Sequence, residues 1–362
     1  MTNIAILGFG TVGGGTAQVL DVQKERLRLA AGGEIRVKYI LDIRDFPGSP
    51  WEDRLVRDIN VILDDPDVKV VCETMGGKEP AFTFTRAAME RGKSVCTSNK
   101  ELVDAFGPEL TQTAKAHSCS YLFEASVGGG IPLLRTLRDS CRHEDITSVA
   151  GILNGTCNYI LTKMDREGTD FADALRQAQE NGFAERNPDA DILGHDTARK
   201  LAILASLISG RRVRFEQVPC QGITEVSTAD LKSARARGKA VKLLGICQRN
   251  PQTGDISVMT APCLVPADNP LYGVNDVFNG VLVHSGCVDD LMFYGRGAGK
   301  MPTASAVAAD VVECVKNAGH TVENGLTDPD DTITPVPFPS ALPGGIELLH
   351  GGDGSSFPRV RS

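Results

Sequence analysis

The stretch "GFGTVGGG", Gly8 to Gly15, directly follows the apolar run "NIAIL" and precedes a helical pattern of apolar residues. A second apolar run, "IRVKYILDIRD", comes next, so Gly8, Gly10 and Gly13 form G-x-G-x-x-G inside one strand–helix–strand unit. In that context the motif is specific for a dinucleotide. Gly8 permits a tight turn, Gly10 lets a pyrophosphate approach the backbone, and Gly13 lets helix and strand pack closely. A glycine-rich turn without a ligand is the alternative.

Strands and helices alternate up to about residue 125. The runs "VKVVCETMGG", "KSVCTS" and "CSYLFEAS" indicate strands, and "PAFTFTRAAMERG" and "ELVDAFGPELTQTAKAHS" indicate helices. This α/β pattern predicts an N-terminal doubly wound, Rossmann-type parallel sheet over residues 1–130. Ligands collect at the carboxyl ends of such strands, which makes the following residues candidate cofactor contacts: Gly8, Gly10, Thr11, Val12, Gly13, Thr74, Met75, Gly76 and Lys100. For Lys100, a solvated surface position is the alternative.

From about residue 131 the alternation is lost. The runs "ITSVAGILNGT", "DISVMTAPCLV" and "GVLVHSG" are typical of strands, and Phe171–Glu180, Asp196–Ile208 and Thr228–Lys242 of helices. We therefore expect a second, α+β domain for substrate binding and dimerisation over residues 131–300. A C-terminal helix at 301–319 is expected to return to the nucleotide domain, and residues 320–362 to form an irregular tail rich in proline and glycine.

Composition narrows the class of protein. The net charge of −8 argues against nucleic acid or an anionic membrane as the main partner. Ten cysteines are scattered without a C-x-x-C pair, which favours reduced thiols over a metal site. We see neither a secretory leader nor an apolar run of membrane length, and therefore expect a cytoplasmic enzyme of small molecules.

The stretch "NGFAERNPDADILGHDTARK", Asn181 to Lys200, gathers several carboxylates before a lysine. Asp196 and Lys200 are separated by i,i+4, so one helical face presents both. An exposed ion pair at a helix start is one interpretation. The other is a binding site for a substrate cation, because a buried cation needs carboxylate partners.

Together these segments resemble the homoserine dehydrogenase family from Asn3 to about Val315. The matching segments are "GFGTVGGG", "TSNKELV", "FEASVGGGIPLLRTL", "GILNGTCNYIL", "NGFAERNPDADILGHDTARKLAILA" and "YGRGAGKMPTASAVAADVV". The resemblance implies NAD(P)-linked interconversion of L-aspartate 4-semialdehyde and L-homoserine, in the pathway to threonine, methionine and isoleucine. It also implies a homodimer.

The resemblance assigns roles to particular residues. Lys200 and Lys100 would share the proton work at the carbonyl that is reduced, with Asp196 holding Lys200. The residues implied to contact the substrate are Glu185, Asp191, Asp196, Gly155 and Thr156. Asn154 or Asn158 could instead be a simple helix cap. Gly297 is implied as a further cofactor contact, and a monovalent cation, usually sodium, would be bound by Glu124, Val127, Gly129 and Ile131.

Cofactor choice rests on two residues near the end of the second strand. Asp42 would favour the ribose hydroxyls of NAD, whereas Arg44 could bind the 2′-phosphate of NADP. The resemblance of "IRD" to an arginine–aspartate pair of the family favours NADP slightly.

The sequence also departs from the family. Phe183 replaces a common tyrosine, Asn187 replaces a common aspartate, and we do not expect a regulatory ACT module. The competing hypotheses are another NAD(P)-dependent semialdehyde reductase and a catalytically silent dinucleotide sensor.

Overall fold

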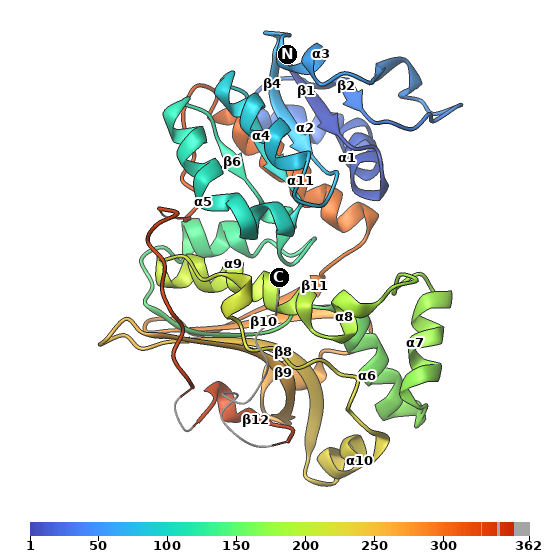
Figure 1. Cartoon of the computed structure of the whole chain (residues 1–362), viewed down its shortest axis with the longest axis vertical. Coiled ribbons are helices and arrows are strands. Elements are labelled where there is room, and N and C mark those ends of the chain that lie inside the picture. Colours follow the sequence, from blue (N-terminus) through green and yellow to red (C-terminus); the bar gives the residue numbers. More distant parts are fainter. Residues whose placement is uncertain (327, 339–340, 351–362) are drawn as a thin grey trace. The chain divides into compact units, whose positions relative to one another are not determined.

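The computed structural model describes residues 1–326, 328–338 and 341–350. The chain forms two compact units. Of the described residues, unit 1 contains those in 1–138 and 298–329, and unit 2 those in 139–297 and 330–350 (Figure 1). Within the described ranges, no helix is both long and apolar enough to cross a membrane.

Unit 1 is built on a six-stranded parallel sheet in the order β3-β2-β1-β4-β5-β6. Its strands are β1 (Thr2–Leu7), β2 (Ile35–Leu41), β3 (Leu55–Val56), β4 (Val68–Glu73), β5 (Ser94–Thr97) and β6 (Tyr121–Leu122). Its helices are α1 (Thr11–Val22), α2 (Lys24–Ala31), α3 (Asn60–Leu63), α4 (Ala81–Glu90), α5 (Lys100–Ala116) and α11 (Lys300–Lys316). The strand order reverses between β1 and β4, where such sheets bind ligands. The predicted doubly wound sheet is confirmed.

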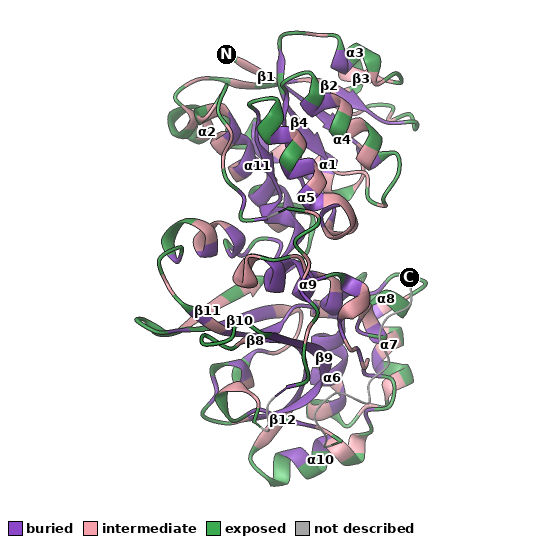
Figure 2. Cartoon of the chain, turned by 60° about the vertical axis from the view of Figure 1, so that its left-hand side comes forward, coloured by how far each residue is buried: buried purple, intermediate pink, exposed green. Residues whose placement is uncertain are grey.

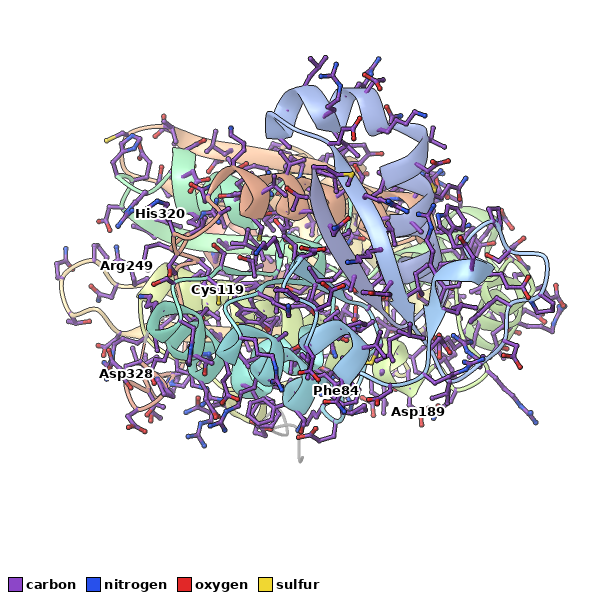
Figure 3. The ribbon with its side chains drawn as sticks, turned by 90° about the horizontal axis from the view of Figure 1, so that it is seen from above. Phe84, Cys119, Asp189, Arg249, His320 and Asp328 are labelled. Atoms are coloured by element: carbon purple, nitrogen blue, oxygen red, sulfur yellow. The ribbon has the colours of Figure 1, made fainter. Side chains whose placement is uncertain are left out.

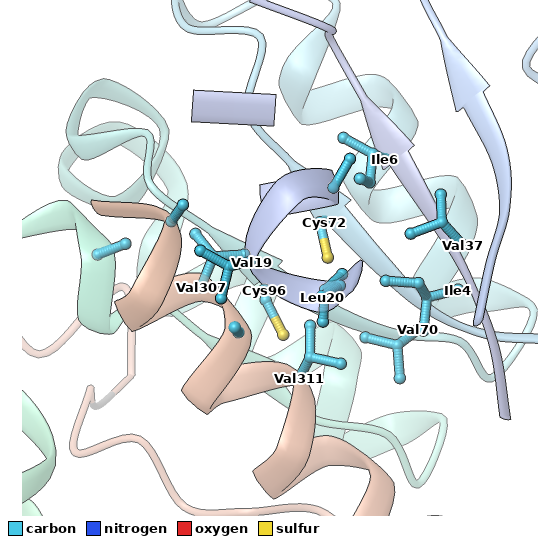
Figure 4. Close-up of a cluster of buried hydrophobic side chains, with 14 of the residues drawn as sticks. Ile4, Ile6, Val19, Leu20, Val37, Val70, Cys72, Cys96, Val307 and Val311 are labelled. Atoms are coloured by element: carbon cyan, nitrogen blue, oxygen red, sulfur yellow. The ribbon is translucent and has the colours of Figure 1, made fainter. Parts of the chain in front are cut away.

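Helices cover both faces of this sheet, with α1, α2 and α11 forming one group and α4 and α5 another. Figure 4 shows the first interface, where Val307 and Val311 of α11 lie beside Val19 and Leu20 of α1 over the strands. Strands that are covered on both faces have continuous apolar sequences, and for that reason these strands could be predicted from the sequence. The expected strand "CSYLFEAS" is the exception, because only Tyr121–Leu122 pairs and a 3₁₀ turn follows at Glu124–Ser126.

Unit 2 is built on an antiparallel sheet in the order β11-β10-β7-β8-β9-β12. Its strands are β7 (Ile146–Ile152), β8 (Lys239–Arg249), β9 (Ile256–Pro266), β10 (Phe278–Ser285), β11 (Asp289–Arg296) and β12 (Glu347–Leu348). Its helices are α6 (Gly155–Glu167), α7 (Phe171–Glu180), α8 (Asp189–Ile192), α9 (His195–Ser209) and α10 (Thr228–Ala236). The predicted α+β fold of this part is confirmed.

One predicted helix of unit 2 is wrong in its second half. The helix expected at Thr228–Lys242 ends at Ala236, because Gly238 adopts a left-handed φ of +68° and β8 begins at Lys239. Val241 and Leu243 pack in one core cluster, whereas Leu244 and Ile246 pack in another. Since β8 is buried on both faces, its sequence lacks the alternation that identifies a strand.

The expected tail is more ordered than its composition suggested. Residues up to Pro329 belong to unit 1, and from Asp330 the chain returns to unit 2. There Phe338 and Ile346 are buried, and Glu347–Leu348 pairs with β9. Figure 2 shows the sheets as mainly buried and the outward faces of the helices as exposed. Residues 351–362 of the predicted tail lie outside the described residues.

Candidate active site

The glycine turn of unit 1 has the conformation that its spacing predicted. Gly8 lies in the left-handed region at φ +86°. A Cβ on Gly13 would lie 1.9 Å from the Gly8 carbonyl oxygen and 2.8 Å from Thr74 Oγ1, so no larger residue fits. Gly10 is the N-cap of α1, whose first turn contains Thr11 and Val12 and no acidic residue. The N–H donors of this turn suit an anionic group.

A cavity of about 410 Å³ opens beside this turn. It is lined by Gly8, Gly10, Leu41, Asp42, Ile43, Arg44, Arg57, Ile59, Thr74, Met75, Pro80 and Phe84. Phe84, labelled in Figure 3, comes from α4. Thr74 Oγ1 donates to the carbonyls of Leu7 and Gly8, which fixes the end of β4 to the glycine turn. Gly76 follows with a left-handed φ of +83°. The cavity and turn together can accommodate the nucleotide part of a dinucleotide.

Asp42 and Arg44 form a pair in this cavity, where the sequence suggested that they would compete. Asp42 is buried and accepts four hydrogen bonds, from the N–H of Phe9 and from the backbone N–H, Nε and Nη2 of Arg44. The Arg44 guanidinium holds the pKa of Asp42 well below its usual range. Arg57 adds a second guanidinium, which donates to the carbonyls of Asp42 and Arg44. The sequence did not predict a role for Arg57, because no local pattern shows that its side chain contacts the residues that follow β2.

Lys100 is the first residue of α5 and is partly buried. Asn99 caps this helix, since its Oδ1 accepts hydrogen bonds from the N–H groups of Glu101 and Leu102. The helix continues without a break through Gly107 and Pro108. Lys100 therefore starts a long, capped helix at the carboxyl end of β5.

Unit 2 buries the charged pair that the sequence left ambiguous. Lys200 Nζ lies 2.8 Å from Asp196 Oδ2 and 2.8 Å from the Leu153 carbonyl oxygen. The side chains of Asp196 and Lys200 are only 8% and 10% exposed. An ordinary surface pair is therefore excluded, and the cost of burying these charges is offset by their hydrogen bonds.

Asn154 completes this network. The sequence predicted at most a helix cap at this position and not its contacts with two carboxylates. Its Oδ1 accepts from the Cys157 N–H at 2.8 Å, so it does cap α6. Its Nδ2 also donates to Asp191 Oδ1 at 2.6 Å and to Asp196 Oδ2 at 2.8 Å. One amide therefore holds two carboxylates side by side. Only the tertiary fold brings residues 154 and 191–196 together.

The other predicted substrate residues differ in their surroundings. Thr156 is buried and donates to the Phe183 carbonyl at 2.6 Å. A Cβ on Gly155 would lie 2.8 Å from the Val277 carbonyl oxygen, so this position needs glycine. Glu185 is exposed, contrary to the expectation of a buried carboxylate, because it lies in a largely exposed loop after α7. Asp189, labelled in Figure 3, is exposed as well.

The turn expected to bind a monovalent cation lies within unit 1. Glu124 is buried, and its carboxylate accepts hydrogen bonds from the N–H groups of Leu134 and Arg135. Within the described part of the chain, the carbonyls of Val127 and Gly129 accept no backbone hydrogen bond, whereas that of Ile131 accepts from Leu133. A carboxylate offers about four acceptor positions, so Glu124 could still coordinate an ion. The donor set is oxygen only and fits a hard cation.

Gly297 lies apart from the other predicted cofactor residues along the chain, at the end of β11 in unit 2. It is buried, and a Cβ there would lie 1.9 Å from Asn279 Nδ2. Close packing against Asn279 is therefore sufficient to require glycine at this position.

Comparisons with known proteins agree on one family. A family model described as homoserine dehydrogenase matches residues 132–312, and one described as the NAD-binding domain of homoserine dehydrogenase matches residues 8–124. A homoserine dehydrogenase from Synechocystis sp. is 42% identical over 330 residues, which cover 90% of this chain and 76% of that protein.

Solved structures give the same result. The chain is similar to a homoserine dehydrogenase from Thiobacillus denitrificans, with a TM-score of 0.86 and 36% identity over 93% of this chain and 79% of the other. A hyperthermophilic archaeal homoserine dehydrogenase in complex with NADPH matches with a TM-score of 0.73 and 26% identity, over 86% of this chain and 97% of the other. The chain belongs to the homoserine dehydrogenase family.

Proposed function

We propose that this chain reduces L-aspartate 4-semialdehyde to L-homoserine, reversibly, with a preference for NADPH. Its family makes it an oxidoreductase that uses a nicotinamide dinucleotide and acts on a small molecule. The observation that carries the assignment to particular residues is the buried network of Asn154, Asp196 and Lys200. Together with Asp191, which Asn154 also holds, it provides carboxylates for an ammonium group and a positioned proton donor in one place.

Lys200 is the proton donor in this proposal. A bound nicotinamide supplies the hydride, and the carbonyl oxygen of the substrate then needs a proton. Within the described part of the chain, Lys200 Nζ donates to two partners, Leu153 O and Asp196 Oδ2. An ammonium group has three donors, so one is left for the substrate oxygen. In the reverse direction Lys200 accepts the proton from the hydroxyl of homoserine.

The carboxylates hold the substrate by its ammonium group. Asp191 and Asp196 are fixed by Asn154, and we propose that Glu185 closes on the same group when substrate binds. Gly155 and Thr156 contact the substrate from the start of α6. Glu185→Gln should raise the KM for homoserine about 10-fold or more and leave NADPH affinity unchanged, because a charge-assisted hydrogen bond is lost. An unchanged KM would remove Glu185 from the site.

The preference for NADPH is supported by the state of Asp42. Its four hydrogen bonds occupy the acceptor positions with which it would bind the ribose hydroxyls of NADH. Arg44 and Arg57 both line the cavity and could contact a 2′-phosphate. Lys100 contributes at the nicotinamide end, with Thr74, Met75 and Gly76.

Three further features belong to the proposal. Sodium would be held by Glu124, Val127, Gly129 and Ile131.

The outer edge of β11 pairs with no strand among the described residues, which supports a homodimer. Light scattering can test this. All ten cysteines lie in the described part of the chain as free thiols, which supports a reducing compartment such as the cytoplasm.

The test is the oxidation of NADPH and of NADH with L-aspartate 4-semialdehyde, for wild type, Arg44→Ala and Asp42→Ala. We expect activity with both cofactors and a lower KM for NADPH. Arg44→Ala should raise the NADPH KM alone, and Asp42→Ala should reduce affinity for both cofactors because it releases Arg44 and the Phe9 N–H. Turnover of other aldehydes but not this one would favour a different semialdehyde reductase. Binding of NADPH without turnover would favour a sensor.

A further inference from the structure

Glu73 is a fully buried carboxylate at the carboxyl end of β4, and the reaction described above gives it no role. Its Oε1 accepts from the Met75 N–H at 2.8 Å, and its Oε2 accepts from Thr97 Oγ1 at 2.6 Å. Met75 belongs to the turn after β4, and Thr97 is the last residue of the neighbouring strand β5. Glu73 thus connects two strand ends at the edge of the sheet where ligands bind.

The connection extends from Thr97 to the start of α5. Thr97 Oγ1 accepts from the Asn99 N–H at 2.9 Å. Asn99 Nδ2 donates to the Gly77 carbonyl at 2.6 Å, and its Oδ1 caps the helix that begins at Lys100. The turn at residues 74–77 and the first residue of α5 are therefore held in one hydrogen-bonded chain that ends on Glu73.

Stability alone is a poor explanation for an acid in this position. Burial raises the pKa of Glu73, and hydrogen bonds from Thr97, from the Met75 and Gly76 N–H groups and from the Asn99 side chain act against that rise. Replacing a buried polar group together with its hydrogen-bond partner by apolar groups of the same shape can be nearly neutral or stabilising. Each of its hydrogen-bond donors instead comes from one of two segments, the turn after β4 and the segment that leads into α5.

We propose that Glu73 is a positioning residue, which fixes the Thr74–Gly77 turn for the cofactor and, through Thr97 and Asn99, fixes the helix start that carries Lys100. This inference rests on the proposed roles of that turn and of Lys100. Glu73 itself touches neither substrate nor cofactor. The two arms meet at Asn99, whose Nδ2 donates to the Gly77 carbonyl, whereas Thr97 itself bonds to Glu73 and Asn99 and not to the turn.

The experiment compares Glu73→Gln, Thr97→Val and Thr97→Ser in the full chain. Glu73→Gln weakens both arms, and we expect kcat to fall about 10–100-fold and the NADPH dissociation constant to rise several-fold, since small misplacements have effects of this size. Thr97→Val weakens the second arm by removing the Thr97 link between Glu73 and the Asn99 N–H, so kcat should fall about 10-fold while NADPH affinity stays within about two-fold. Thr97→Ser keeps the hydroxyl and should restore kcat to within about three-fold of wild type.

The matched control is Thr85→Val in α4. Thr85 is fully buried in the same unit, and its Oγ1 has no hydrogen-bond partner among the described residues. Removal of this hydroxyl should leave both kcat and NADPH affinity unchanged. NADPH binding can be followed through Trp51, the single tryptophan, whose ring contacts Phe9 beside the glycine turn.

Two results would overturn the proposal. One is a Glu73→Gln enzyme whose kcat and NADPH affinity match wild type. The other, which decides if Glu73→Gln does not fold, is a Thr97→Ser enzyme as impaired as Thr97→Val. If wild type binds NADPH but does not turn over the semialdehyde, the proposed function fails, and NADPH affinity of Glu73→Gln alone then decides whether Glu73 positions the turn.

Discussion

The candidate nucleotide site of unit 1 and the candidate substrate site of unit 2 are built in different ways. In unit 1 the features suited to a nucleotide are mainly main-chain features, namely a glycine turn, the N-terminus of α1 and a cavity beside them. In unit 2 the features suited to the amino-acid substrate are side chains, with Asn154, Asp196 and Lys200 joined in a buried network. A main-chain site tolerates side-chain variation but no added bulk, whereas a side-chain network depends on each polar atom.

The largest expected effect is on the side-chain network. Lys200→Ala should lower kcat about 10²–10⁴-fold, the usual contribution of a general acid, and leave NADPH affinity unchanged. The control is Lys163→Ala, which breaks an exposed i,i+4 pair with Glu167 on α6. That variant should keep full activity, because exposed pairs contribute little. If the kcat of Lys200→Ala stayed within a few-fold of the wild-type value, the proton donor would be a group other than Lys200.

The glycine turn should show the opposite pattern. Gly13→Ala places a Cβ 1.9 Å from a backbone oxygen that cannot move freely, so it should displace the turn. We expect the NADPH dissociation constant to rise about 10-fold or more, as for other small misplacements, and the unfolding temperature to fall. Gly14→Ala is the matched control, because its Cβ would meet only Phe9 at 3.9 Å. Equal NADPH binding by both variants would contradict the close-packing argument.

Asn154 separates capping from carboxylate binding. Asn154→Ser retains an N-cap oxygen but loses the amide that holds Asp191 and Asp196. We expect kcat/KM for homoserine to fall about 10-fold, the equivalent of one charge-assisted hydrogen bond. Asn269→Ser makes the same change at the cap of the turn Pro270–Gly273 and should leave kcat/KM unaltered. Loss of stability without loss of kcat/KM in Asn154→Ser would reduce Asn154 to a cap.

The smallest effect concerns a buried lysine that takes no part in the proposed chemistry. Lys242 donates to the Val274 carbonyl and to Asn275 Oδ1, and burial lowers its pKa from 10.5 to about 8. The charged groups that act on it are Asp165, Arg166 and Asp276. Between pH 8 and 10.5 the unfolded state therefore binds the extra proton, and the contribution of Lys242 to the free energy of unfolding rises with pH.

Lys242→Met lacks this contribution, so the stability gap between wild type and variant should widen in favour of wild type from pH 7.5 to pH 10. The increase should not exceed about 3 kcal/mol, at 1.36 kcal/mol per pKa unit. Urea denaturation of both proteins at the two pH values measures it. A difference in the free energy of unfolding that stays constant between the two pH values would contradict the lowered pKa of Lys242. As a control, Lys242→Met should alter the KM for homoserine less than Asn154→Ser does.

The same difference between the two units decides what the sequence could predict. The parallel sheet and glycine turn were predictable, because buried strands and glycine spacing are local patterns. The i,i+4 spacing of Asp196 and Lys200 was local too, but their burial was not. Asn154 looked like a cap, since its amide contacts residues 37 and 42 positions away. The start of β8, Lys239–Lys242, continues the pattern of the predicted helix because the strand is buried on both faces and does not alternate.

The most direct test of the whole account compares two alcohols as substrates. L-homoserine and 4-hydroxybutanoate differ only in the α-ammonium group, which the carboxylates near Asn154 are proposed to bind. With NADP⁺ we predict saturable oxidation of L-homoserine, with L-aspartate 4-semialdehyde as the product. The kcat/KM for 4-hydroxybutanoate should be at least about 100-fold lower, because Asp191 and Asp196 lose a charged partner. Equal kcat/KM values for the two alcohols would contradict the account.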